Sequence, residues 1–126
     1  MNGIVAALFI LVGLIHLLPA VGVVSDVRLH ALYGVGELSA DLSLLLRHRA
    51  VLFAILGALL IAAAFLPGLR LIVTATGLLS MLSFVALAHS IGTTNPALLK
   101  VLRVDIAASV ALLVAAAVHL RLAATP

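Results

Sequence analysis

The side chain with the clearest chemical potential in this 126-residue chain is Asp105, a carboxylate inside a long apolar run. An ionised group at that depth in a membrane needs a partner, because lipid cannot solvate its charge. Its own helix supplies none: of the residues three and four positions away, only Ser109 is polar. We therefore expect a cation from another helix. Arg49 and Arg47 are the favoured candidates, followed by His16 and His89.

Other polar side chains are predicted to gather around Asp105 at one end of the molecule, where they form a candidate polar cluster. Its members are His16, Tyr33, Glu37, Arg47, His48, Arg49, His89 and Asp105. Two readings stay open. The cluster is either an interhelical bridge that fixes the register of the helices, or the lining of a site for an anionic headgroup, a quinone-like ring or a proton path. We assign no catalytic residue.

Metal and cofactor sites are not predicted. His16, His89, Glu37 and Asp105 have the nitrogen and oxygen donors that metals use, but no spacing such as H-E-x-x-H supports a site. The chain has no cysteine, so thiolate and disulfide chemistry are excluded. No phosphate-binding loop, nucleotide fingerprint or nucleophile arrangement occurs either.

The composition places these residues in a membrane protein. Apolar residues make up 66% of the chain and charged residues 9%, whereas water-soluble domains carry about 25% charged residues. The mean hydropathy is +1.44. The net charge of +3 does not indicate nucleic-acid binding, because no basic run exceeds Arg47-His48-Arg49 and the chain has one Tyr and no Trp. The expected partner is the lipid bilayer.

The fold is predicted to be all-α, an integral membrane four-helix bundle within one domain, residues 1–126. Each spanning helix needs about 20 mainly apolar residues, and turn signals such as Pro67-Gly68 separate four such runs. The helices are expected at about 3–24, 42–66, 69–91 and 97–122. A short interfacial helix or re-entrant segment, residues 25–41, is expected between the first and second.

A five-helix alternative would send residues 27–46 through the membrane. That segment contains Arg28, His30, Glu37 and Asp41, and each mid-membrane charge costs about 2.5–3.5 kcal/mol. Ser39 and Asp41 are instead typical of the start of a helix near residue 42. We therefore favour four helices.

The basic residues predict the orientation. With four spans, five of them fall on one side and two on the other: Arg28, Arg47, Arg49, Lys100 and Arg103, against Arg70 and Arg121. Because basic residues concentrate on the cytoplasmic side, both termini are expected outside the cytoplasm of a bacterial inner membrane. The end opposite the polar cluster has only Arg70, His119 and Arg121.

Small residues at helical spacing predict close contacts between helices, since they let backbones approach within a membrane. One stripe is Ala54, Ala58 and Ala62. A second stripe is Ala107, Ala111 and Ala115.

Four segments together resemble a family of small, uncharacterised bacterial four-helix membrane proteins, DoxX-like in size and layout. They are Gly13–Pro19, Leu32-Tyr33-Gly34, Leu44–Phe53 and Val104-Asp105. The resemblance implies the fold and a membrane location, with Arg47, His48 and Arg49 as the core of the motif. Some members carry the label phosphopantetheine adenylyltransferase. Such enzymes are soluble nucleotidyltransferases with an H-x-G-H motif, which this chain lacks.

The leading functional hypothesis is a non-enzymatic membrane protein. It would be an accessory subunit, or a lipid or small-molecule binder, that uses the polar cluster on the cytoplasmic side. One alternative is a proton- or ion-coupled transporter that works as an oligomer, because four short helices rarely enclose a pathway. A membrane-embedded isomerase or quinone-linked enzyme is the other. A homo-oligomer or a larger membrane complex is compatible with each.

Overall fold

The computed structural model describes residues 3–125, which form helices and no strands. The helices are α1 (Gly3–Leu17), η1 (Leu18–Val23), α2 (Asp26–Tyr33), α3 (Ala40–Phe65), η2 (Pro67–Leu69), α4 (Arg70–Ile91) and α5 (Pro96–Ala124); η1 and η2 are 3₁₀ turns. The predicted all-α fold is confirmed.

Four helical segments are long and apolar enough to cross a membrane: Gly3–Val23, Ala40–Phe65, Pro67–Ile91 and Pro96–Ala124. The fifth helix, α2, has 8 residues, a length of about 12 Å, and cannot cross a hydrocarbon core of about 30 Å. The chain is therefore a small polytopic membrane protein with four spans. The short helix expected between the first two spans is present.

The helix ends follow local sequence signals. The Ser39 side chain accepts a hydrogen bond from the Leu42 backbone N–H at 3.2 Å and caps α3, as predicted. Gly92 ends α4 in the left-handed conformation with φ 76°, which glycine adopts without steric cost. Pro19 has no backbone N–H, and the first span tightens from α-helix to the 3₁₀ turns of η1 at Leu18.

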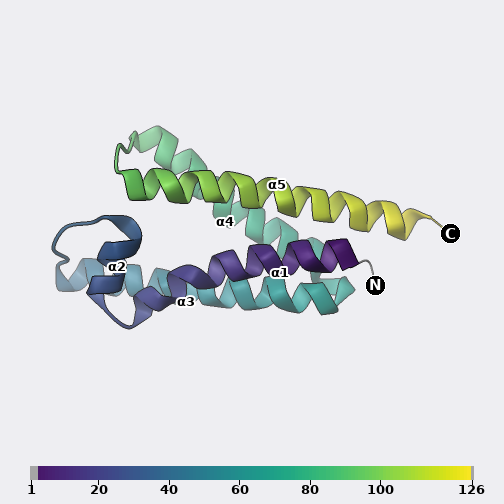
Figure 1. Ribbon diagram of the computed structural model, residues 1–126, viewed down its shortest axis with the longest axis horizontal. Coiled ribbons are helices and arrows are strands. Elements are labelled where there is room, and N and C mark those ends of the chain that lie inside the picture. Colours follow the sequence, from purple (N-terminus) through teal and green to yellow (C-terminus); the bar gives the residue numbers. More distant parts are fainter. Residues whose placement is uncertain (1–2, 126) are drawn as a thin grey trace.

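The bundle has two dissimilar ends (Figure 1). Both chain termini lie at one end, which we call the terminal end, and α2 lies at the other, the α2 end. Helix α1 packs against α3 and α5, and α4 packs against α5 and, less extensively, α3. At the α2 end, helix α2 contacts η1, α3 and α5.

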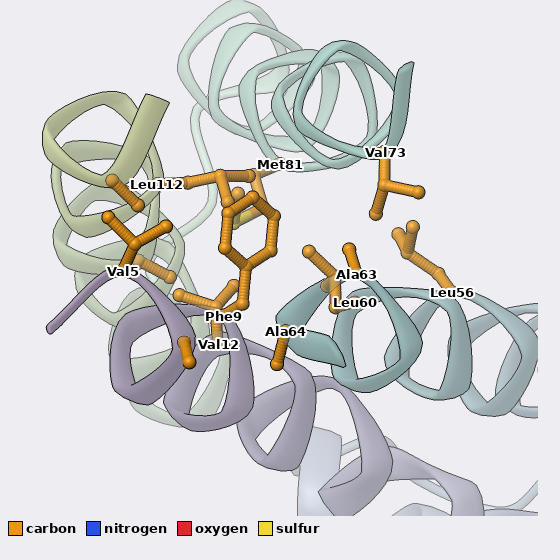
Figure 2. Close-up of a cluster of buried hydrophobic side chains, with 13 residues drawn as sticks. Val5, Phe9, Val12, Leu56, Leu60, Ala63, Ala64, Val73, Met81 and Leu112 are labelled. Carbon is orange, nitrogen blue, oxygen red and sulfur yellow. The ribbon is translucent and has the colours of Figure 1, made fainter. Parts of the chain in front are cut away.

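The terminal half is filled by an apolar core drawn from all four spans (Figure 2). Phe9 of α1, Leu60 of α3 and Leu112 of α5 are fully buried, and Met81 of α4 is 1% exposed. Large and small apolar side chains from the four helices pack together in this half.

The closest helix approach is made by two glycines. A methyl group added to Gly57 would lie 2.8 Å from the Gly13 carbonyl oxygen, so α1 and α3 touch backbone to backbone. The alanine stripes do not mark this contact, and Ala58 and Ala107 are exposed. The prediction that the stripes carry the helix contacts is therefore wrong for these two positions.

Candidate functional site

An arginine on α3 holds the beginning of α2 in place. The Arg47 guanidinium lies 2.9 Å from an Asp26 carboxylate oxygen, and it also donates to the Val23 carbonyl at 3.2 Å and the Ser43 hydroxyl at 3.1 Å. The Ser43 hydroxyl donates in turn to Asp26. These two hydrogen bonds, from Ser43 first and Arg47 second, hold the pKa of Asp26 below its usual value.

A side-chain amide holds the other end of α2. Asn95 donates from Nδ2 to the carbonyls of Tyr33, at 2.8 Å, and Gly34, at 3.2 Å. Its Oδ1 accepts from the Ala97 N–H at 2.9 Å and so caps α5. Gly34 ends α2 with φ 59°, a conformation that suits glycine. Because both ends are tied down, α2 covers the α2 end of the bundle.

Beneath this cover is a cavity of about 280 Å³, which we call the polar cavity. Side chains from α1, η1, α2, α3 and α5 line it, and most of them are apolar. The polar ones are His16, Tyr33, Arg49, Lys100 and Asp105.

His16 of α1 presents one ring nitrogen without a partner. It is 2% exposed, and its Nδ1 lies 2.9 Å from the Val12 carbonyl oxygen. A carbonyl only accepts, so Nδ1 carries the proton and the neutral ring leaves Nε2 as an acceptor. Nε2 is buried and has no hydrogen-bond partner within residues 3–125.

Tyr33, the last residue of α2, has a buried hydroxyl. The side chain is 3% exposed, and its Oη has no hydrogen-bond partner in the described part of the chain. Burial raises the pKa of Tyr33 above its usual value; the nearby positive charge of Arg49 opposes this rise and the negative charge of Asp105 adds to it. The pKa of Tyr33 therefore depends on the charges of both Arg49 and Asp105.

Asp105 of α5 is 7% exposed and lines the same cavity. Its backbone carbonyl accepts a hydrogen bond from Ser109 at 2.7 Å. Its carboxylate forms no hydrogen bond or salt bridge with any residue between 3 and 125. The expected bridge to Arg47 is absent because Arg47 binds Asp26 instead.

Arg49 faces the cavity without pairing to Asp105. Its guanidinium carbon lies 5.1 Å from the centre of the Tyr33 ring, 4.7 Å from that of Phe53 and 5.4 Å from that of Phe84. Cation–π contacts of this kind contribute about 0.5–2 kcal/mol each. They leave the N–H donors without acceptors among the described residues.

A second hollow, which we call the lateral groove, lies between α3 and α4 and has a volume of about 420 Å³. Apolar side chains such as Leu56 and Leu59 line it, together with the hydroxyls of Thr76, Ser80 and Ser83. Arg49 and Phe53 line both the groove and the polar cavity and form the wall between them.

The structure brings together four members of the candidate cluster: His16, Tyr33, Arg49 and Asp105. It places the other members elsewhere. Arg47 holds α2, and His48, His89 and Glu37 are exposed and line neither hollow. Among residues 3–125, no group of three or more His, Cys, Asp or Glu could hold a metal ion.

Sequence reasoning missed the aromatic surroundings of Arg49 and the binding of Asp26 to Arg47. One signal was available. Arg49 and Phe53 are four residues apart, a spacing that places two side chains on the same helix face. The contacts of Asp26 and Phe84 join segments far apart in the chain, and no local pattern predicts them.

Comparison of the chain with protein-family models, curated proteins and solved structures finds no match. The DoxX-like resemblance therefore stays a prediction.

Proposed function

We propose that this small membrane protein binds a small molecule in the polar cavity. The observation that carries the proposal is the convergence of four groups on one cavity. His16 Nε2 and Tyr33 Oη are buried without partners, and Asp105 and Arg49 are charged without an ion pair between them.

Energetics support a ligand at these groups. A buried polar group without a hydrogen bond costs about 1–3 kcal/mol, and a charged one costs more. Asp105 and Arg49 line the same cavity, yet they do not form an ion pair with each other. A ligand that meets all four groups must offer both donors and acceptors, because His16 Nε2 and the carboxylate accept whereas the guanidinium donates.

Mass spectrometry of the purified protein tests the proposal. Protein taken from native membranes in mild detergent should carry one small molecule that Asp105→Asn and Arg49→Gln reduce at least tenfold. His89→Gln is the matched control, because His89 is exposed and lines neither hollow. Equal amounts of every co-purified molecule in all four proteins would contradict the proposal, as would the absence of any bound molecule.

A proton- or ion-coupled transporter is less well supported. The polar cavity does hold ionisable groups, but the terminal half beyond it is closed by the apolar core around Phe9, Leu60 and Leu112. Within residues 3–125 a single chain therefore offers no continuous polar path, and transport would need an oligomer.

We propose further that the protein lies in a bacterial inner membrane with the α2 end in the cytoplasm and both termini outside. The five-to-two division of basic residues supports this orientation. A reporter that is active only in the cytoplasm, fused after Pro126, should be silent. A strong signal from it would reverse the orientation.

A further inference from the structure

We propose that the ligand is a bilayer lipid whose phosphate and primary ammonium occupy the polar cavity and whose hydrocarbon chain lies in the lateral groove. This inference rests on the proposed function and specifies its ligand class. It starts from the wall of Arg49 and Phe53 that the two hollows share.

The polar cavity contains both hydrogen-bond donors and hydrogen-bond acceptors. Arg49 and Lys100 are cationic donors, and the Tyr33 hydroxyl can donate beside them. His16 Nε2 and the Asp105 carboxylate are acceptors. A phosphate matches the first set, because guanidinium and phosphate form strong charge-assisted hydrogen bonds. A primary ammonium, with three N–H donors and no acceptor, matches the second.

The size of the polar cavity limits it to a headgroup. Its volume of about 280 Å³ is at the lower limit of the roughly 300–1,000 Å³ typical of small-molecule sites. A hydrocarbon chain attached to the headgroup must therefore lie outside it. The lateral groove begins at the shared wall and is lined mainly by leucine, isoleucine and phenylalanine side chains.

The direction of the groove matches that of a lipid in one leaflet. From Arg49 to Leu59, the groove follows α3 away from the α2 end for about 15 Å, half of a hydrocarbon core of about 30 Å. Figure 1 shows α3 and α4 joined at the terminal end and diverging toward the α2 end. Leu52 and Ile55 of the groove are half exposed on the membrane-spanning helices, so the groove opens to the bilayer.

The Arg49 side chain in the shared wall can move when a lipid enters. Arg49 is held there by the faces of Tyr33, Phe53 and Phe84 and by no hydrogen bond within residues 3–125. A phosphate that moves in from the groove would gain the guanidinium as a partner without breaking an existing ion pair.

Binding of defined lipids to the delipidated protein tests the inference. Tyr33 is the single tyrosine and the chain has no tryptophan, so tyrosine fluorescence reports the polar cavity alone. Lysophosphatidylethanolamine should bind at least tenfold more tightly than lysophosphatidylcholine of equal chain length, whose quaternary ammonium has no N–H. It should also bind at least tenfold more tightly than lysophosphatidylglycerol, which has no ammonium, and than glycerophosphoethanolamine, which has no chain.

A pair of variants separates the groove from the headgroup site. Ser80→Phe fills the lateral groove and should weaken lysophosphatidylethanolamine at least tenfold while leaving glycerophosphoethanolamine unchanged. Leu79→Phe is the matched control, since Leu79 is 72% exposed and outside the groove; it should bind like the wild type. Circular dichroism checks that both variants fold.

The outcomes distinguish the inference from the proposed function. If lysophosphatidylcholine or lysophosphatidylglycerol bound as tightly as lysophosphatidylethanolamine, the ammonium assignment would be overturned. Equal binding with and without the chain, or an unaffected Ser80→Phe, would overturn the groove assignment. In each of these cases the polar cavity would still bind a ligand, and the proposed function would stand. No binding of any probe, with no co-purified molecule, would overturn both.

Discussion

Each end of the bundle contains an arginine without a carboxylate partner, and the two arginines are used in opposite ways. At the terminal end, Arg70 is 4% exposed and donates to the carbonyls of Ala63, at 3.1 Å, and Ala64, at 3.0 Å, and to His119 Nδ1, at 3.3 Å. Those carbonyls belong to the last turn of α3, where helices leave acceptors unpaired. At the α2 end, Arg49 contacts ring faces only.

The difference separates a structural charge from one available for binding. Arg70 completes the C-terminus of α3 and interacts favourably with the negative end of its dipole. Arg49 forms no hydrogen bond or ion pair within residues 3–125. The Asp105 carboxylate, His16 Nε2 and Tyr33 Oη likewise have no hydrogen-bond partner among these residues. In the described part of the terminal half, the Thr74 hydroxyl is buried without a partner, but it is uncharged and lines neither hollow.

The largest expected effect is on stability at the terminal end. Arg70→Gln removes the guanidinium from two buried carbonyls, and hydrogen bonds to charged groups contribute about 1.5–3 kcal/mol each. We expect a loss of about 2–4 kcal/mol, measured by thermal unfolding in detergent. Arg121→Gln, an exposed arginine near the same end, should change stability little. If the two variants were equally stable, Arg70 would not be the structural charge.

A smaller loss is expected where α1 and α3 cross. Gly57→Ala places a methyl group 2.8 Å from the Gly13 carbonyl oxygen, and overpacking of this kind costs about 1–3 kcal/mol. Gly68→Ala is the control, because an added methyl group there meets nothing within 4 Å. Equal melting temperatures for the two variants would show that the crossing is not tightly packed.

The ion pair between Asp26 and Arg47, which we call the clamp on α2, should weaken in acid. The Asp26 pKa is lowered in the folded protein, so its stabilising effect is complete above the unfolded-state pKa of about 3.9. The effect is lost as the pH falls through the lower folded-state pKa. The protection factor of the α2 amides, which is the ratio of the intrinsic to the observed rate of hydrogen exchange, should therefore fall in acid, and Asp26→Asn should lower it at neutral pH. Unchanged protection of α2 in this variant would contradict the clamp.

The smallest expected effect is on the titration of Tyr33. Burial raises the pKa of Tyr33. The charge of Arg49 partly offsets this rise, and the charge of Asp105 adds to it. Ultraviolet absorbance of this single tyrosine should show deprotonation above the usual pH of about 10. Asp105→Asn should shift the titration to lower pH and Arg49→Gln to higher pH. Shifts in the opposite directions would show that the charges of Arg49 and Asp105 do not set the Tyr33 pKa in this way.

Much of this fold is predictable from the sequence, because its signals are local. Apolar runs separated by Pro67-Gly68 and by the segment before Pro96 give the four spans. The charges of residues 25–41 argue against a fifth, and Ser39 marks the start of α3. These signals depend on a few neighbouring residues and on transfer into lipid.

The candidate site is less predictable, because its contacts are tertiary. Arg47 and Arg49 are equivalent in sequence as partners for Asp105, yet Arg47 is taken by Asp26 and Arg49 faces the cavity. The sequence shows Arg70 as an ordinary basic residue at the less polar end. Its guanidinium reaches the Ala63 and Ala64 carbonyls across the short η2 turn, a geometry that the sequence pattern alone does not show.

The most direct test of this contrast is the thermal stability of Asp105→Asn in delipidated, ligand-free protein, measured beside Arg70→Gln. A carboxylate that serves a ligand is a buried charge without a partner, and neutralising such a charge removes a desolvation cost. We therefore expect the melting temperature of Asp105→Asn to equal or exceed that of the wild type, while Arg70→Gln lowers it. A fall as large as that of Arg70→Gln, relieved when Arg49→Gln is added, would show instead that Asp105 and Arg49 form a structural bridge.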